Sequence, residues 1–123
     1  MLKAIIFDLD GTLVDSLPYH HESWRILFKN NNIEEYDFTE ILKEYKGGGT
    51  LELMTSVFGN MYTKDELKKM SDDKEVIFRD IYRSKIYPIE GLKQFLDNLK
   101  ENNILLSIGS NAVRKNVLMT IEE

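Results

Sequence analysis

The chain has 123 residues, of which 42% are hydrophobic and 30% are charged, and this balance is typical of a folded globular protein. Its formal net charge is −5 and its basic residues are scattered, which argues against binding to nucleic acids or to anionic membranes. The absence of cysteine excludes disulfides, thiolate metal sites and cysteine nucleophiles.

The N-terminal segment does not resemble a secretion signal. Its apolar run is short and ends in acidic residues, whereas a signal peptide carries a longer apolar region. No segment of the chain approaches the apolar length that spans a bilayer. We therefore expect a cytoplasmic protein that does not enter a membrane.

The first predicted element is a short β-strand over residues 3–8. Residues 5–7 are consecutive and apolar, and such an unbroken run is typical of a strand buried on both faces of a parallel sheet. Polar residues from Asp8 onward mark the end of this strand.

A helix is predicted from Ser16, where the apolar spacing changes from consecutive to helical. Asp15 or Ser16 is expected to cap its first turn, and the asparagines at 30–32 are expected to end it. The residues predicted to share its inward face are Leu17, His20, His21, Trp24, Leu27 and Phe28.

Three more helices are predicted before residue 87. One covers residues 37–45, the next follows the glycines at 47–49, and the third begins at a capping box of Thr63 and Glu66. The last of them should end before Pro88. The residues predicted to face inward are Ile41, Leu42 and Tyr45, then Leu51, Met54 and Phe58, then Leu67, Met70, Ile77, Phe78, Ile81 and Tyr82.

The character of an α/β protein returns after residue 86. An amphipathic helix with Leu92, Phe95, Leu96 and Leu99 precedes a buried strand over residues 104–109. A final helix carries Val113, Val117, Leu118 and Ile121 on one face.

This order predicts an α/β fold in which a helical domain is inserted into a partial Rossmann-like core. The insert is residues 16–86, and the core is residues 1–15 and 87–123. A parallel sheet built from these elements has only two strands, so both of its long edges stay unpaired.

The strongest chemical signal is the sequence DLDGT at residues 8–12. Residues two apart in a strand point the same way, so Asp8 and Asp10 can converge at the carboxyl end of the first strand, where open α/β sheets bind ligands. Two close carboxylates favour a cation between them, and oxygen ligands suit Mg²⁺. One carboxylate can then attack phosphorus while the other moves a proton. The alternative is a helix cap or a solvated acidic loop.

Other candidates have simpler alternatives. Ser110 follows the second strand and fits either a phosphate ligand or a helix N-cap. His20, His21 and Trp24 on an apolar face fit packing as well as substrate contact. The glycines at 47–49 fit a turn between helices, and no Lys-Ser or Lys-Thr follows them, so we reject a phosphate-binding P-loop.

Four segments resemble the haloacid dehalogenase superfamily. FDLDGTLVDS at 7–16 resembles its first motif, and YHHESW at 19–24 is similar to the start of the helical cap in its β-phosphoglucomutase and sugar-phosphatase branch. YPIEGLKQFL at 87–96 resembles the return from cap to core. SIGSNA at 107–112 resembles the second motif, an apolar strand that ends in Ser or Thr.

The resemblance implies an enzyme of phosphate transfer that uses Mg²⁺. Asp8 matches the nucleophile, which becomes an aspartyl phosphate, and Asp10 matches the general acid/base. The side chain of Asp8 and the backbone carbonyl of Asp10 match two magnesium ligands.

The same resemblance implies a set of residues that bind phosphate or substrate. Ser110 matches the hydroxyl that holds a phosphoryl oxygen, and the N–H of the adjacent Asn111 is expected to help at the start of the last helix. The remaining candidates are Gly11 and Thr12 in the first motif, His20 and Trp24 on the cap helix, and Gly48 in the glycine loop.

The sequence departs from the family pattern after the second motif. The family uses a later Lys and a later acidic pair, and neither is assigned here, because Arg114 and Lys115 lie in the first turns of the last helix and Glu122 and Glu123 lie at its far end. Three explanations follow: a fragment of a longer protein, a chain whose sheet is completed by a partner such as a second copy, or a non-catalytic remnant. We favour the first.

The expected activity is hydrolysis of a small phosphorylated metabolite such as a sugar phosphate. The chain alone is expected to be a poor catalyst, because its metal affinity and its neutralisation of charge are both incomplete. The alternatives are a β-phosphoglucomutase-type phosphotransferase and a non-catalytic module that self-associates as a homodimer. Two features weigh against the mutase. Thr12 is the phosphatase-like residue of the first motif. Thr50 stands at the place where the mutase branch has an Arg-bearing pattern.

Overall fold

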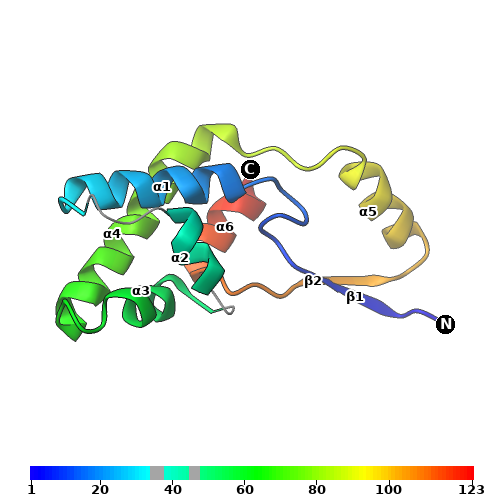
Figure 1. The fold of residues 1–123 in the computed structure, drawn as a ribbon. Coiled ribbons are helices and arrows are strands. Elements are labelled where there is room, and N and C mark those ends of the chain that lie inside the picture. Colours follow the sequence, from blue (N-terminus) through cyan, green and yellow to red (C-terminus); the bar gives the residue numbers. More distant parts are fainter. Residues whose placement is uncertain (34–37, 45–47) are drawn as a thin grey trace.

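In the computed structural model, residues 1–33, 38–44 and 48–123 are described. The sheet has two parallel strands, β1 (Ala4–Phe7) and β2 (Leu105–Ile108), with Ala4 opposite Leu105 and Phe7 opposite Ile108. Figure 1 shows helices α1 to α4 and α6 grouped at one end of the molecule and the sheet with α5 at the other. The prediction of an α/β fold with a short parallel sheet is confirmed.

The described helices follow the predicted order. Their bounds are α1 (Leu17–Asn30), α2 (Phe38–Glu44), α3 (Thr50–Phe58), α4 (Lys64–Tyr82), α5 (Leu92–Glu101) and α6 (Arg114–Glu122), with a 3₁₀ helix η1 (Arg83–Lys85) after α4. The ends predicted at Asp37 and Tyr45, as well as Gly47, lie outside the described residues, as does the side chain of Leu42. Among the described helices, none combines the length and the apolar character needed to cross a membrane.

The long helix α4 begins as predicted. The Thr63 hydroxyl accepts a hydrogen bond from the N–H of Glu66 at 3.2 Å, and the Glu66 carboxylate accepts one from the N–H of Thr63 at 2.7 Å. This reciprocal capping satisfies backbone donors that the first turn of a helix leaves unpaired. The helix ends at Tyr82, before Pro88, which confirms the predicted boundary.

The helical region has its own apolar core, in which α1 packs along α4 and α3 closes one side (Figure 1). Its buried residues are Trp24, Leu27, Phe28, Ile41, Leu53, Met54, Phe58, Leu67 and Met70.

Three residues predicted to face inward from the helical region are instead exposed: Leu17, His21 and Leu51. Leu17 belongs to the first turn of α1, where its side chain lies beside Gly11 rather than between helices. In α3 the buried stripe contains Leu53 in place of Leu51, because α3 turns that face toward α4.

The prediction that the first strand is buried on both faces is wrong. Ile5 and Phe7 are half-buried, but Ile6 is 74% exposed and Leu105 on β2 is 72% exposed. Helix α5 covers one face, where the rings of Phe7 and Phe95 meet edge to face with centroids 6.3 Å apart. No other described element covers the opposite face, so side chains there remain in water.

Only part of the face predicted for α6 is buried, because Val117 and Leu118 are half-buried. Val113 and Ile121 are exposed, and the buried residues of α6 are Asn116, Met119 and Thr120. The reason is that α6 lies against α4, where Met119 packs with buried aromatic residues. Val117 is half-buried and packs instead on the cluster formed by Leu9, Leu13 and Val14.

The chain leaves the sheet region and returns to it at one place. Val14 forms an antiparallel bridge with Pro88, and the N–H of Ile89 donates to the carbonyl of Leu13 at 3.0 Å. This pairing holds the residues before α1 against the residues that precede α5. It agrees with the predicted insertion of residues 16–86, which stays a prediction.

Candidate active site

The two aspartates of the first motif follow β1 in a tight turn. Asp8 is exposed and its Oδ1 accepts the N–H of Leu9 at 2.9 Å, whereas Asp10 is half-buried. The turn needs a glycine, because Gly11 has φ +75° and donates its N–H to the carbonyl of Val14 at 2.8 Å. The buried side chains of Leu9 and Val14 fix the turn against the core.

Asp8 and Asp10 line the same cavity, which has a volume of about 320 Å³. It lies between the strand ends, the loop after β2 and the helices α1, α3, α4 and α6. The lining residues are Asp8, Asp10, Leu17, His20, His21, Trp24, Gly48, Gly49, Thr50, Leu53, Lys74, Glu75, Ser110, Asn111, Ala112, Val113 and Asn116. Most of the residues predicted as candidates therefore meet around one space.

Two predicted candidates are not brought to this cavity. Gly11 and Thr12 are exposed and do not line it. The N–H of Thr12 donates to the carbonyl of Leu9 at 3.1 Å. Their observed role is to shape the turn that carries the aspartates.

The alternative in which Ser110 caps the last helix is wrong. Helix α6 begins at Arg114 with Val113 as its N-cap, and the Ser110 hydroxyl accepts the N–H of Ala112 at 3.1 Å. The expected position of Asn111 at the start of this helix is wrong for the same reason. Both residues belong to a loop after β2 that lines the cavity beside the aspartates.

Of the two predicted caps of α1, Asp15 and Ser16, it is Ser16 that occupies the N-cap position, but its side chain makes no capping hydrogen bond. Its hydroxyl donates instead to Oδ1 of Asp10 at 2.5 Å, and Nε2 of His20 lies 3.4 Å from the same oxygen. Burial alone would raise the pKa of Asp10, but hydrogen bonds from His20 and Ser16 and the charges of His20 and Lys74 lower it below its usual value. Asp10 is therefore held as a carboxylate.

His20 joins Asp10 to a buried lysine. Nζ of Lys74 lies 2.8 Å from Nδ1 of His20, and the imidazole stacks on Phe78 with centroids 3.8 Å apart. An ammonium that donates to Nδ1 leaves the ring proton on Nε2, which faces Asp10. The same ammonium lies 5.5 Å from the ring centre of Trp24, within the range of a cation–π contact.

Lys74 is partnered by its neighbour Glu75, whose Oε1 lies 3.3 Å from Nζ. The side chains are only 2% and 9% exposed, respectively. Glu75 also accepts hydrogen bonds from the Thr50 hydroxyl and, at 2.6 Å, from the Asn116 amide. Burial lowers the pKa of the Lys74 ammonium, and the negative charges of Glu75 and Asp10 offset part of that effect.

Sequence reasoning missed Lys74, Glu75 and Asn116 as parts of the site. A signal was present for the first two, because they continue the inward stripe of α4 at helical spacing between Met70 and Phe78. Charged residues at inward positions are rarely buried unless they are paired, and that pattern marks a functional or structural ion pair. Asn116 gave no such signal, because its burial depends on how α6 docks against α4.

The aspartates fit a magnesium ion that keeps several water ligands. Among the described residues, no group of three or more His, Cys, Asp or Glu side chains could hold a metal. Mg²⁺ in phosphate-transfer sites is commonly bound by one or two carboxylates together with water and substrate phosphate. The exposed carboxylate of Asp8 and the backbone carbonyl of Asp10 are suitable oxygen donors for that arrangement.

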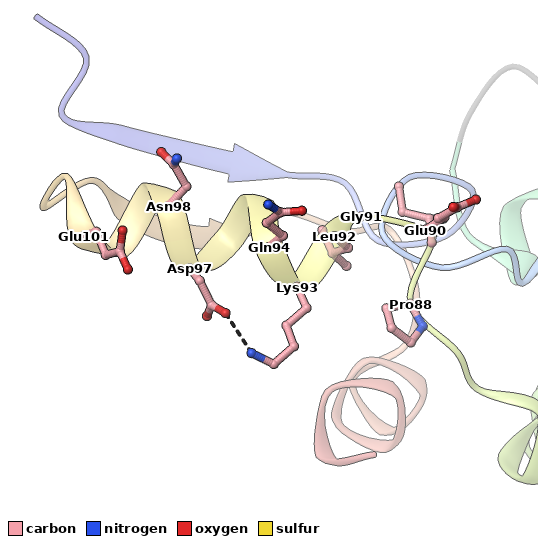
Figure 2. Close-up of a pocket in the computed structure, with 10 residues that line it drawn as sticks. Pro88, Glu90, Gly91, Leu92, Lys93, Gln94, Asp97, Asn98 and Glu101 are labelled. Atoms are coloured by element: carbon pink, nitrogen blue, oxygen red, sulfur yellow. Dashed lines mark hydrogen bonds and ion pairs between the residues drawn. The ribbon is translucent and has the colours of Figure 1, made fainter.

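A larger hollow, of about 700 Å³, lies along α5 and is a weaker candidate. All of its lining residues come from one segment, residues 88–101. Figure 2 shows their side chains spread along the helix, with Lys93 and Asp97 paired at 2.7 Å. No aspartate pair or strand end contributes to it, so it lacks the convergence of elements that the smaller cavity has.

Residues 5–123 match the family model of haloacid dehalogenase-like hydrolases. The chain belongs to this family. It is 30% identical over 118 residues to β-phosphoglucomutase of Bacillus subtilis (strain 168), covering 90% of this chain and 51% of the relative. It is 26% identical over 114 residues to phosphoglycolate phosphatase of Aquifex aeolicus (strain VF5), covering 93% and 51%.

The fold is also shared with solved members of the haloacid dehalogenase family. A hydrolase of family IA, variant 3, from Entamoeba histolytica HM-1:IMSS superimposes with a TM-score of 0.82 at 24% identity, covering 98% of this chain and 54% of that one. The chain thus spans about half the length of the curated relatives that it matches.

Proposed function

We propose that this chain carries the nucleophile and the acid/base of a Mg²⁺-dependent phosphatase that acts on a small phosphorylated metabolite. The observation that carries the proposal is the meeting of Asp8, Asp10 and Ser110 around one cavity at the ends of β1 and β2. The names of the relatives, a phosphoglucomutase and a phosphoglycolate phosphatase, support a phosphorylated small molecule as substrate.

The reaction proposed for this site has two steps. In the first, an Asp8 carboxylate oxygen attacks phosphorus, the bond to the ester oxygen breaks, and Asp10 gives that oxygen a proton. In the second, water attacks phosphorus of the aspartyl phosphate and Asp10 takes a proton from the water. The bond between phosphorus and the Asp8 oxygen breaks, so that inorganic phosphate leaves and the Asp8 carboxylate is regenerated. A Mg²⁺ ion bound at Asp8 and at the Asp10 carbonyl would offset the negative charge of carboxylate and phosphate.

The surroundings of Asp10 suit both of its roles. Its lowered pKa keeps the carboxyl ionised, as a base requires. To act as an acid it must first gain a proton. Nε2 of His20, 3.4 Å away, is placed to give its proton to Asp10 while Nδ1 takes one from the Lys74 ammonium at 2.8 Å. The hydroxyl of Ser110 and the N–H of Asn111 are proposed to hold phosphoryl oxygens.

The test is hydrolysis of p-nitrophenyl phosphate with Mg²⁺. Replacing the nucleophile by Asp8→Asn should lower the rate at least ~100-fold, because the amide cannot attack phosphorus. Asp97→Asn, an exposed change on α5, serves as the control and should leave the rate unchanged. Equal activity of the wild type and Asp8→Asn would exclude Asp8 as nucleophile, and a wild type that neither hydrolyses the ester nor binds phosphate would contradict the function.

A second candidate is a phosphotransferase that returns the phosphate to a sugar hydroxyl instead of to water. The 30% identity to a β-phosphoglucomutase favours it. Thr50 weighs against it, because it stands where the mutase branch has an Arg-bearing pattern, and a neutral hydroxyl that is bonded to Glu75 does not supply that positive charge. Incubation with a glucose phosphate separates the two: a mutase produces an isomeric sugar phosphate, and a phosphatase releases inorganic phosphate.

A further inference from the structure

We propose that Glu75 sets the substrate specificity of this cavity, by selecting phosphate esters whose remaining part is uncharged and carries hydroxyl groups. The inference rests on the proposed function, because it takes the phosphoryl group to lie at Asp8. The rest of the ester is then proposed to extend toward the part of the cavity wall that α3 and α4 form with Thr50, Leu53 and Glu75.

This wall offers no surplus positive charge for a second anionic group. Among the described residues that line the cavity, the cationic side chains are Lys74 and, when protonated, His20 and His21. The ammonium of Lys74 is already engaged by Nδ1 of His20 and by Oε1 of Glu75. Its charge is therefore compensated, and a carboxylate or second phosphate placed here would face Glu75.

The surroundings of Glu75 favour the ionised form of its carboxyl group. Burial alone would raise its pKa, but the charge of Lys74 and the hydrogen bonds from Thr50 and Asn116 lower it below the usual value. An ionised carboxylate in a partly enclosed cavity repels a like charge far more strongly than it would in water, because the local dielectric response is weaker. The same carboxylate attracts hydroxyl donors.

Glu75 keeps room for one more donor. A carboxylate has about four acceptor sites. The described residues Thr50, Lys74 and Asn116 fill three of them. A substrate hydroxyl can occupy the remaining one, and a charge-assisted bond of this kind is stronger than a neutral one.

The size and the apolar part of the cavity favour a short ester. Its volume of about 320 Å³ is at the small end of the range for ligand sites. Trp24 and Leu53 are buried core residues that also contribute to its lining, and they suit the carbon side of a small polyol.

The experiment compares glycerol phosphate with phosphoglycerate, which differ in that a hydroxymethyl group is replaced by a carboxylate. Dissociation constants are measured by NMR titration of the whole chain with Mg²⁺, and inorganic phosphate is the probe for the phosphoryl position. We expect glycerol phosphate to bind at least ~tenfold more tightly, equivalent to about 1.4 kcal/mol. Glu75→Gln should bring the ratio close to one, whereas the exposed change Asp72→Asn on the same helix should not alter it.

The outcomes separate the two proposals. If phosphate binds and phosphoglycerate binds as tightly as glycerol phosphate, the specificity assigned to Glu75 is wrong and the proposed function stands. If neither phosphate nor either ester binds, the proposed function fails. The ratio in the wild-type chain decides between these results even if Glu75→Gln does not fold, and a folded Glu75→Gln that keeps the wild-type ratio also overturns the inference.

Discussion

Lys74 and Glu75 show how a single helix can carry both core and site residues. They are consecutive in α4, both are buried, and their partners come from α1, α3 and α6. Burying two charges costs more free energy than most ion pairs return, so a pair retained here points to a role beyond stability. The aspartates at 8 and 10 could be predicted from sequence because their spacing and the preceding strand are local. The partners of Lys74 could not, since they depend on how distant elements pack.

Removing only one member of this pair should be costly. We expect Lys74→Met to lower the free energy of unfolding by about 3 kcal/mol, because Glu75 is left buried without its cation. Urea denaturation followed by circular dichroism measures the change. The double variant Lys74→Met/Glu75→Leu should regain much of the loss.

The matched control for the pair is Lys69→Met, in the same helix. Lys69 is 77% exposed and pairs with Asp73 on the surface, so its removal should change stability by less than about 0.5 kcal/mol. If the two lysine variants lose the same free energy of unfolding, the buried pair contributes no more to stability than the exposed pair does, and the prediction is wrong.

At the scale of elements, the described helices and strands follow the order read from the sequence, and the faces that they bury are less well predicted. The predicted start and end of α4 and most of its predicted inward face agree with the structure, because a capping box and a long regular apolar period are both local signals. The face predicted for α6 is only partly buried, since Val113 and Ile121 are exposed. Beside Met119 the helix buries the polar residues Asn116 and Thr120, and Asn116 bonds to Glu75 and Arg79 of α4, a contact that apolar periodicity cannot reveal.

The start of α4 gives a prediction on helix capping. Thr63→Ala removes the hydroxyl that accepts the N–H of Glu66, and we expect a loss of about 1 kcal/mol in unfolding free energy. Chemical denaturation checks it. Thr55→Ala in α3 is the control, since that hydroxyl only bonds the carbonyl of Leu51 within the helix and its loss should be nearly neutral.

The docking of α6 gives a second prediction for this scale. Asn116 donates to Glu75 at 2.6 Å and accepts from Arg79 at 2.7 Å, so Asn116→Ala leaves two charged groups of α4 short of a partner. We expect a loss of about 1–3 kcal/mol and faster amide exchange within α6. Hydrogen exchange measured by mass spectrometry tests this, with the exposed Lys115→Ala as control. Unchanged protection of α6 in Asn116→Ala would contradict it.

Across the whole molecule, the helical end is well packed and the sheet end is open. The sheet of β1 and β2 has one covered face, and the described residues leave its other face and both outer edges in solvent, where Ile6 and Leu105 are exposed. Exposed strand edges and apolar faces promote association. A two-stranded sheet could be foreseen from the sequence, but the bare face could not, because a run of apolar residues indicates burial without showing what provides it.

This open face leads to a prediction on association. We expect the chain to self-associate as its concentration rises, and Ile6→Lys with Leu105→Lys to reduce that association, because charges oppose contact between apolar faces. Sedimentation velocity over a concentration series measures it. Val76→Lys, at a 47% exposed apolar residue of α4, is the control and should leave association unchanged. A wild-type chain that stays monomeric throughout would refute the expectation.

The bridge between Val14 and Pro88 has a consequence for how this molecule can be altered. Because Val14 and Pro88 are paired, the chain leaves the sheet region and returns to it at one point. We therefore expect the segment between them to tolerate changes of length, away from Ser16, His20 and Lys74, without displacing β1 or β2. Evolution can therefore alter residues of this segment that line the cavity while the turn that carries Asp8 and Asp10 is kept. A change of substrate preference then requires changes only in the segment between Val14 and Pro88, and the proposed nucleophile stays the same.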